Sequence, residues 1–509
     1  MSQRPTPSLA ALGMANLSSV TPPLMKMSLI LAITSLLCRI VYNLFFHPLA
    51  KYPGPRLRAA STIPFMYALV IGQHHEVVVN MHKEYGTVVR IAPNKLSYIT
   101  GQAWQDINGH RKRTEPEMPR DDKWFTRNPN GPDMVYCSRE EHRRYRGLFA
   151  GGFSDRSLRS QEPLIGGYVT SLINNLARRV KERKDTVFDL VTWFECTTFD
   201  VVGDLTFGES FGCLETGEVH PWLRSMSDTA KAFQVIRACQ EIPLIGQYST
   251  TVLPRIFRVG VIKKSQEHFA FTEGKLRRRL DRKEPRADFL GPILQKPDGK
   301  GLSYPELLTH SSILILAGGD TVTGACAAIV YLLLQNPDKM EILVNEVLTT
   351  FQHEDMITID STSRLVYLRA VIKEGLRHYP PVPIGIPRTV PEGGSMIDKE
   401  FVPEGTSVCV SHMAAYQSTL NFERPDEFCP ERFLDTTMFS DKLDVYQPFS
   451  LGPRNCIGRN LAYAEMQMIL TRLLYRFDLR LQDDKFAFGS QRTFTGWERP
   501  PLNVSLIAR

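Results

Sequence analysis

A ten-residue loop near the C-terminal end restricts what this chain can fold into, because it joins one cysteine to glycines, prolines and an arginine. It runs Phe449-Ser450-Leu451-Gly452-Pro453-Arg454-Asn455-Cys456-Ile457-Gly458, and apolar residues with helical spacing follow it. A cysteine at a helix start faces free backbone N–H groups and the positive end of the helix dipole, which favour thiolate over thiol. Gly452 and Gly458 would allow close approach of a flat ligand, and Arg454 could pair with a ligand carboxylate.

The length and composition predict a large folded domain. At 509 residues the chain exceeds one ordinary core, and 43% hydrophobic and 10% aromatic residues exclude a disordered chain. The net charge of +7 is spread over 61 basic and 54 acidic residues. No basic block is interleaved with aromatic residues, so no nucleic-acid partner is expected. A local basic face that meets an acidic protein partner remains open.

The cysteines do not form a disulfide or zinc pattern. There are nine, far apart and without a C-x-x-C pair: Cys38, Cys137, Cys196, Cys213, Cys239, Cys326, Cys409, Cys429 and Cys456. An odd, scattered set is typical of reduced thiols in a cytosolic compartment. Cys456 differs from the other eight only in its surrounding loop.

The N-terminal region predicts four segments. Residues 1–26 are polar, residues 27–46 form an apolar run long enough to cross a bilayer, residues 47–55 form a proline-rich hinge, and residues 56–509 form one domain. A cleaved signal peptide with its core at Ser28–Cys38 is an alternative, but no small-x-small cleavage site follows it. A core helix is the other alternative. The sequence favours a membrane anchor.

The charges around the apolar run predict its orientation. Basic residues are denser after the run than before it: Lys51, Arg56 and Arg58 against Arg4 and Lys26. This bias places the large domain in the cytosol. The sequon that begins at Asn16 then lies on the luminal side, although such triplets often occur by chance.

Hydrophobic periodicity predicts a mainly α fold with a smaller β part. Helical spacing dominates from Glu140 to Leu348 and from Arg364 to His378. Short strand-like runs occur at Thr87–Ile91, Leu96–Ile99, Ser407–Val410 and Leu502–Leu506.

The cysteine loop resembles the haem-binding loop of the cytochrome P-450 family. Its pattern F-x-x-G-x-R-x-C-x-G has five fixed positions: Phe449, Gly452, Arg454, Cys456 and Gly458. A cysteine alone would more often be an ordinary buried residue, but the whole string is highly specific. The resemblance implies a single large domain of the cytochrome P-450 type that binds heme b (iron protoporphyrin IX). Cys456 would supply the axial thiolate to the metal.

Two further segments resemble the family's structural cluster. Glu374-Gly375-Leu376-Arg377 matches the E-x-x-R pair, and Arg432 in Pro430-Glu431-Arg432-Phe433 matches the third member. By itself, a Glu/Arg pair three residues apart on a helix is common on protein surfaces. The resemblance implies that these three residues support the haem-binding region without taking part in the chemistry.

Ala317-Gly318-Gly319-Asp320-Thr321 resembles the family's oxygen-activating turn. The surrounding helix is expected to begin near Ser303-Tyr304-Pro305 and to end before Asn336-Pro337. Two glycines inside a helix cost roughly 1 kcal/mol each against alanine, so a local groove is expected. The resemblance implies that Thr321 donates a hydrogen bond at the reacting oxygen and that Asp320 relays protons. The alternative is a capping Asp-Thr pair at a helix break.

Three residues match family positions that bind the haem propionates. His142 and Arg146 resemble the W-x-x-x-R motif, with His142 in place of tryptophan, and Arg388 follows Arg377 by eleven residues. His142 could equally be a surface histidine.

The resemblance implies an NADPH- and O2-dependent monooxygenase that receives electrons from an NADPH-cytochrome reductase, a flavoprotein. Arg143 and Arg144 are candidates for the surface that docks the reductase.

The segments Phe45–Pro55 and Tyr379–Arg388 resemble fungal microsomal members that tailor secondary metabolites. An apolar terpenoid, polyketide or alkaloid substrate and a single-pass endoplasmic reticulum anchor are therefore expected. The alternatives are a reductase-independent haem-thiolate isomerase or dehydratase, and a non-catalytic haem-binding membrane protein. The intact Asp320–Thr321 pair argues against the isomerase or dehydratase.

Overall fold

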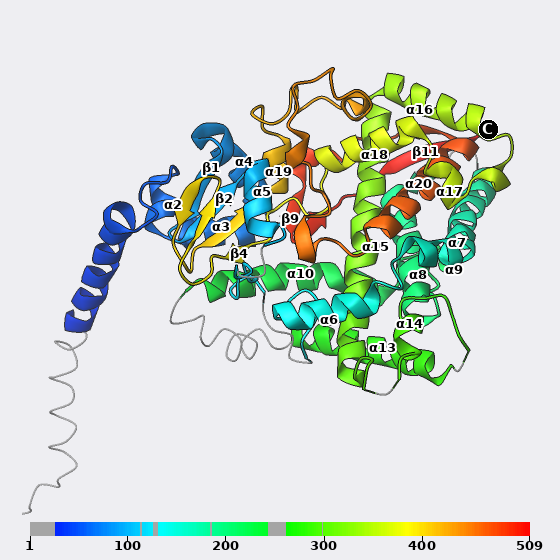
Figure 1. Ribbon diagram of the computed structural model, residues 1–509. Helices are drawn as coiled ribbons and strands as arrows, with labels where there is room; N and C mark the ends of the chain where they lie inside the picture. The colour runs from blue at the N-terminus through cyan, green and yellow to red at the C-terminus, as the bar shows by residue number, and fades with distance from the viewer. Residues whose placement is uncertain are drawn as a thin grey trace, which may run out of the picture.

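A computed structural model describes residues 26–111, 115–125, 131–183, 186–242, 261–282, 284–297 and 299–509. The polar segment predicted for residues 1–26, except its last residue, and the sequon at Asn16 lie outside these ranges. Helices gather around one long helix, α15, and a sheet region lies at the end from which the N-terminal helix projects (Figure 1). The predicted mainly α fold with a smaller β part is confirmed.

The α-helices are numbered as in Figure 1. In chain order they are α2 (Arg56–Ala60), α3 (Ile63–Val70), α4 (His74–Tyr85), α5 (Gly101–Asn108), α6 (Arg139–Phe149), α7 (Asp155–Glu182), α8 (Leu190–Phe207), α9 (Cys213–Thr216), α10 (Pro221–Gln240), α13 (Val261–Asp281), α14 (Gly291–Leu294), α15 (Tyr304–Gln335), α16 (Pro337–Thr350), α17 (Ile359–Thr362), α18 (Val366–His378), α19 (His412–Tyr416) and α20 (Arg459–Arg476). The π-turn is η1 (Tyr42–Phe46), and the 3₁₀ turns are η2 (Glu354–Met356), η3 (Pro430–Phe433), η4 (Leu443–Val445), η5 (Gly452–Arg454) and η6 (Phe488–Ser490).

The strands form four small sheets. They are β1 (Val88–Ala92), β2 (Lys95–Tyr98), β3 (Val187–Asp189), β4 (Arg388–Thr389), β5 (Ser395–Ile397), β6 (Glu400–Val402), β7 (Ser407–Val410), β8 (Phe477–Leu481), β9 (Arg492–Phe494), β10 (Gly496–Glu498) and β11 (Asn503–Ala508). The largest sheet has the order β1-β2-β7-β4, with β2 and β7 parallel and the other neighbours antiparallel. The others are β3-β11-β8, β10-β9 and β5-β6. All four predicted strand regions are confirmed.

Helix α15 has the boundaries that the sequence predicted. Ser303 and Glu306 form a capping box at its start, and Pro305 occupies the first turn, where a missing N–H costs nothing. The helix ends at Gln335, with Asn336 as its C-cap, because Pro337 begins α16. Most of α15 is buried, so the core of the molecule lies around it.

The two glycines in the middle of α15 allow another helix to approach closely. A Cβ on Gly318 would lie 2.8 Å from the Val202 side chain, and one on Gly319 would lie 2.4 Å from Phe199. Both neighbours belong to α8, so an alanine at either position would force the two helices apart. The predicted groove is therefore filled on this side by α8, and the glycines serve helix packing.

The N-terminal helix Lys26–Phe46 is long and apolar enough to cross a membrane, and its apolar side chains are exposed. Helix α15 passes the same test of length and composition, but it is mostly buried inside the domain. Residues 47–55 contain no helix, and Leu49 and Tyr52 are buried. This segment is fixed to the domain rather than standing free as a linker.

Arg90 holds the junction between the N-terminal helix and the domain. Its backbone N–H donates to the Pro53 carbonyl at 2.7 Å, and its Nη1 donates to the Asn43 carbonyl at 2.9 Å. Asn43 in turn donates from its side chain to the Ala60 carbonyl at 2.9 Å. The side chain of Arg90 is buried, so these bonds are shielded from water.

Candidate active site

The cysteine loop is closed by its own backbone. The N–H of Cys456 donates to the Phe449 carbonyl at 2.8 Å. Gly452 has a φ of +75°, and a Cβ there would lie 1.9 Å from the Asn108 carbonyl oxygen. The close approach that requires glycine at position 452 is therefore an approach to α5, and the predicted approach of Gly452 to a ligand stays a prediction. Helix α20 follows the loop, with Gly458 as its N-cap.

The electrostatics of Cys456 differ from the sequence-based expectation. Burial raises the pKa of the Cys456 thiol, and the opposing effects of the Gly458 N–H, Arg146 and Arg459 do not cancel this rise. The Cys456 residue is nevertheless exposed to solvent. The predicted local effects exist, but the helix start alone does not produce a thiolate. A thiol that binds a metal ion is deprotonated by the ion.

Three arginines meet beside the loop. Arg454 Nε donates to Glu117 Oε1 at 2.5 Å, and Arg388 Nη1 lies 3.6 Å from the same oxygen. Arg120 joins them through a β-bridge between Arg120 and Arg388. Glu117 is the carboxylate that pairs with Arg388 and Arg454, so the group carries an excess of positive charge.

The arginine group is suited to an anionic ligand. Within the part of the chain that the structure describes, Arg120 Nε and Arg388 Nε are buried without a hydrogen-bond partner. Burial lowers the pKa of Arg388 to about 10, with a further contribution from Arg454. Burial, Arg388 and Arg454 lower the pKa of Arg120. Unpaired buried donors and mutually repelling charges fit a group with two carboxylates, such as the haem propionates.

His142 and Arg146, both on α6, have different surroundings. His142 is buried, and burial, Arg454 and Arg146 lower its pKa to about 4, so its ring is neutral at pH 7. It is therefore not a surface histidine. Arg146 donates to the Asn455 carbonyl at 2.6 Å and to the Asn455 side chain at 2.5 Å. It braces the cysteine loop directly, and its predicted propionate contact stays a prediction.

The turn of α15 that resembles the oxygen-activating turn is stabilised by a hydrogen bond within the helix, and the predicted role of Thr321 stays a prediction. Thr321 Oγ1 donates to the Ala317 carbonyl at 2.9 Å, one turn earlier. Leu316 and Ala317 are exposed, although the helix around them is mostly buried. Asp320 forms an ion pair with Arg499, a residue that the sequence did not single out.

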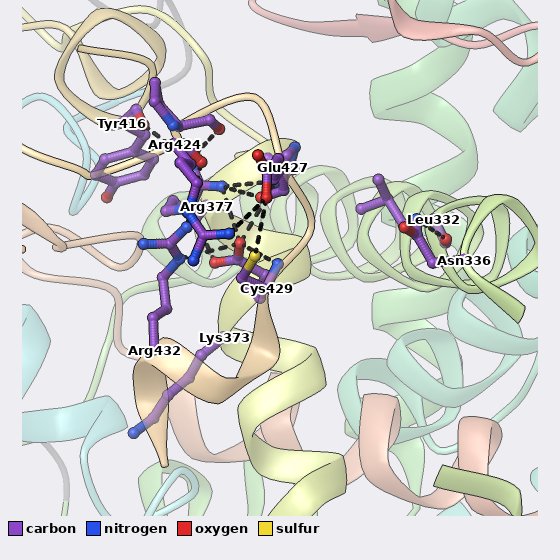
Figure 2. A network of polar contacts seen from close by, with 12 residues as sticks. Leu332, Asn336, Lys373, Arg377, Tyr416, Arg424, Glu427, Cys429 and Arg432 are labelled. Atoms are coloured by element: carbon purple, nitrogen blue, oxygen red, sulfur yellow. Dashed lines mark hydrogen bonds and ion pairs between the residues drawn. The ribbon is translucent and has the colours of Figure 1, made fainter. Parts of the chain in front are cut away.

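The Glu-Arg-Arg cluster is completely buried. Arg377 donates to both carboxylate oxygens of Glu374, at 2.8 and 2.9 Å, and Arg432 Nε donates to the same carboxylate at 3.2 Å. Arg377 also donates to the carbonyls of Tyr416 and Pro425. Figure 2 shows Arg377 and Arg432 reaching toward one point from α18 and η3. The three residues that the sequence predicted as a structural cluster do lie together.

Comparison with known proteins identifies the family. The cytochrome P-450 family model matches residues 59–503. The chain belongs to the cytochrome P-450 family. It is 42% identical to the cytochrome P-450 monooxygenase astA of Talaromyces wortmannii, over 94% of this chain and 96% of that protein. It is 39% identical to a trichothecene C-15 hydroxylase of Fusarium sporotrichioides, over 96% of this chain and 99% of that protein. It is also 39% identical to an averantin hydroxylase of Dothistroma septosporum, over 93% and 89% respectively.

Family membership confirms the reaction class predicted from the sequence. This cytochrome P-450 is a haem monooxygenase, and the family uses heme b with a cysteine thiolate and receives electrons from NADPH through a reductase. The residues present fit this cofactor, because one accessible cysteine lies beside a buried arginine group with unpaired donors.

The structure adds four residues that sequence reasoning missed: Arg120, Glu117, Asp441 and Arg499. Glu117, Arg120 and Arg499 contact partners far away in the chain, so no local spacing marks them. Asp441 is only nine residues after Arg432, but it belongs to no motif; Arg432 Nη1 donates to it at 2.5 Å. This second carboxylate makes the buried cluster of this cytochrome P-450 neutral, with two acids and two arginines.

Proposed function

We propose that this cytochrome P-450 holds its haem through Cys456 and hydroxylates an apolar fungal secondary metabolite. The observation that carries the proposal is the accessible Cys456 at the start of α20, beside three converging arginines. Helix α20 packs against α15, which bears Asp320 and Thr321. Arg388, Arg454 and Arg120 would hold the propionates, with His142 as a neutral hydrogen-bonding partner.

The reaction consumes O2, two electrons and two protons for each oxygen atom inserted into the substrate, and it releases one water. The haem, when bound, supplies the activation of O2. The chain supplies the protons and orients the substrate. The hydroxyl of Thr321 donates to the Ala317 carbonyl in this structure, and in the reaction it would donate to the reacting oxygen instead. Asp320 would relay protons from water.

The relatives support an apolar substrate. Two of them are named for hydroxylation of a trichothecene and of averantin. The exposed side chains of Leu316 and Ala317 give α15 an apolar face beside the predicted oxygen turn. A terpenoid, polyketide or alkaloid scaffold fits such a surface better than a charged molecule, because burying an unpaired charge is costly.

The helix Lys26–Phe46 is proposed to anchor the enzyme in the endoplasmic reticulum membrane by a single pass, with the catalytic domain in the cytosol. Its support is the exposed apolar surface of the helix and the excess of basic residues that follow it. A reductase in the same membrane could then supply the electrons.

The function is tested with the metabolite that accumulates when the gene is deleted in its source organism. Membranes that contain the full-length enzyme and reductase should convert this metabolite only when NADPH and O2 are present. Thr321→Ala should retain haem but lower the product formed per NADPH by at least about tenfold, with release of hydrogen peroxide, because a hydrogen-bond donor is lost. Product and peroxide are measured together.

Thr323→Val is the matched control, because Thr323 lies half a turn away and bonds to Thr198 of α8 at 2.8 Å. Thr323→Val should form as much product per NADPH as the parent enzyme. Conversion of a hydroperoxide without NADPH would favour an isomerase or dehydratase instead. Haem binding without turnover would favour a binding protein. Equal coupling in Thr321→Ala and parent would refute the role of Thr321.

A basic surface beside the cysteine loop is proposed to dock the reductase. Arg369 and Arg459 are exposed, and Lys373 lies between solvent and core. Burial lowers the pKa of Lys373, and Arg369 and Arg459 add to this effect, which shows that the three cations are close together. Arg144, by contrast, is bound to Glu306 at 2.6 Å, so its charge is already paired.

Charge reversal on this surface should slow electron delivery. Arg459→Glu combined with Arg369→Glu should lower the rate of haem reduction by the reductase by about tenfold at low salt, because opposite charges accelerate association. The difference should shrink at high ionic strength. Lys83→Glu on α4 is the control, because Lys83 is exposed on another part of the molecule. If the rate of haem reduction were independent of salt, and equal in the double charge-reversal variant and in Lys83→Glu, this docking surface would be excluded.

A further inference from the structure

The carboxylate of Asp320 is held by an arginine from the C-terminal end of the chain. Arg499 follows β10, and its Nη2 donates to Asp320 Oδ1. The Arg499 side chain is only 8% exposed, whereas that of Asp320 is 40% exposed. The pair therefore joins a buried cation to an acid that still reaches solvent.

Helix α15 is shaped to receive this guanidinium. Gly324 lies one turn after Asp320, and a Cβ there would lie 3.2 Å from Arg499 Nη1. Burial lowers the pKa of Arg499, but the charge of Asp320 and its hydrogen bond raise it more, so the net shift is upward. Arg499 is thus always positively charged, and the carboxylate of Asp320 neutralises its charge.

The hairpin that carries Arg499 is rigidly supported. Trp497 Nε1 donates to the Pro380 carbonyl at 2.8 Å, and its ring stacks on Tyr379 at 4.4 Å between centroids. Glu498, the residue before Arg499, also forms an ion pair with Lys231 of α10, but both side chains are partly exposed, so this pair adds little to the support. An arginine on such a support can fix the orientation of its partner, because little motion remains in the backbone.

We propose that Arg499 is a positioning residue for proton delivery by Asp320. It binds one carboxylate oxygen and leaves the rest of the exposed carboxylate free to exchange protons with water. In the relay, Asp320 accepts a proton from water and passes it to the reacting oxygen; no electron moves, and the carboxylate returns to its ionised form. This inference rests on the proposed function, because it assigns a partner to Asp320 in that reaction.

A double-mutant cycle tests the proposal with Arg499→Gln, Asp320→Asn and the double variant in the full-length holoenzyme. With reductase, NADPH and the metabolite from the deletion strain, each single variant should lower the ratio of product to hydrogen peroxide by about tenfold. The double variant should be no worse than either single variant, because both act through the same carboxylate. Arg499→Lys should recover part of the coupling, since the pair uses one guanidinium nitrogen.

One spectroscopic measurement and one control variant separate this role from a merely structural one. The infrared C–O stretching band of the reduced, CO-bound holoenzyme should shift in Arg499→Gln and lie closer to the parental position in Arg499→Lys, because Asp320 changes orientation. Lys231→Met, which removes the neighbouring ion pair on the same hairpin, should leave both the band and the coupling unchanged. Additive losses in the cycle, or parental coupling in Arg499→Gln, would overturn the proposal. A parent enzyme that does not oxidise the metabolite would overturn the proposed function instead.

Discussion

Replacing Cys456 by serine is expected to abolish the red-shifted Soret band of the reduced, CO-bound protein and all NADPH-dependent product formation. Serine has nearly the same size as cysteine, so the loop should fold with its Cys456 N–H to Phe449 bond intact. What is lost is the thiolate that donates electron density to the iron and favours cleavage of O2. The absorbance spectrum and a turnover assay on the same sample measure both effects.

Cys137→Ser is the matched control, because Cys137 also lies at the edge of the site. Its carbonyl accepts a hydrogen bond from Arg454 at 2.9 Å, and its sulfur lies 4.0 Å from Arg454 Nη1. Burial raises the pKa of this thiol to about 11. Cys137→Ser should keep the thiolate spectrum and the activity. The assignment of Cys456 would be wrong if Cys456→Ser kept the red-shifted band.

The sequence predicted those parts of the site whose residues lie close together in the chain. The loop around Cys456, the pair Glu374–Arg377 and the turn at Asp320–Thr321 are each short motifs on one element. Helix α15 was predicted with its correct ends because a capping box and a following proline are local signals. Hydrophobic periodicity gave the strands for the same reason.

Features that depend on distant segments could not be predicted in this way. Arg499 pairs with Asp320 across 179 positions, and Arg454 pairs with Glu117 across 337. Nothing in the spacing of the sequence indicates such pairs, because charged residues are common throughout the chain. The pKa of Cys456 illustrates the same limit, since burial depends on the whole fold whereas the helix start is local. The mid-helix glycines were assigned to a groove, but their neighbours belong to α8.

Replacing Glu374 by glutamine is expected to lower the free energy of unfolding by about 3–5 kcal/mol, because it leaves a buried arginine without its carboxylate. Glu374, Arg377 and Arg432 are all fully buried. Asp441 remains as a partner for Arg432. In the described part of the chain, the remaining hydrogen-bond partners of Arg377 include no carboxylate: they are the carbonyls of Tyr416, Pro425 and Glu427 and the ring of His378. Urea unfolding of parent and variant at pH 7 measures the difference.

The pH dependence of this difference follows from the direction of the pKa shift. Burial alone would raise the pKa of Glu374, but Arg377 and His378 hold it well below its usual value of 4.5. A depressed carboxyl pKa contributes stability that is fully present above the unfolded-state value and is lost as the pH falls toward the folded-state value. The gap between parent and Glu374→Gln should therefore be constant from pH 6 to 8 and should narrow below about pH 4.5.

Asp360→Asn is the control for a surface ion pair with similar helical spacing. Asp360 and Arg364 lie 2.5 Å apart, but their side chains are 60% and 76% exposed. Water solvates both groups when the pair is broken, so this change should cost about 0.5 kcal/mol or less. Equal losses in Asp360→Asn and Glu374→Gln would show that burial does not set the strength of the cluster. If only Glu374→Gln lowers the free energy of unfolding, and if this variant also retains haem less well, then the buried cluster stabilises the part of the fold that holds the cysteine loop.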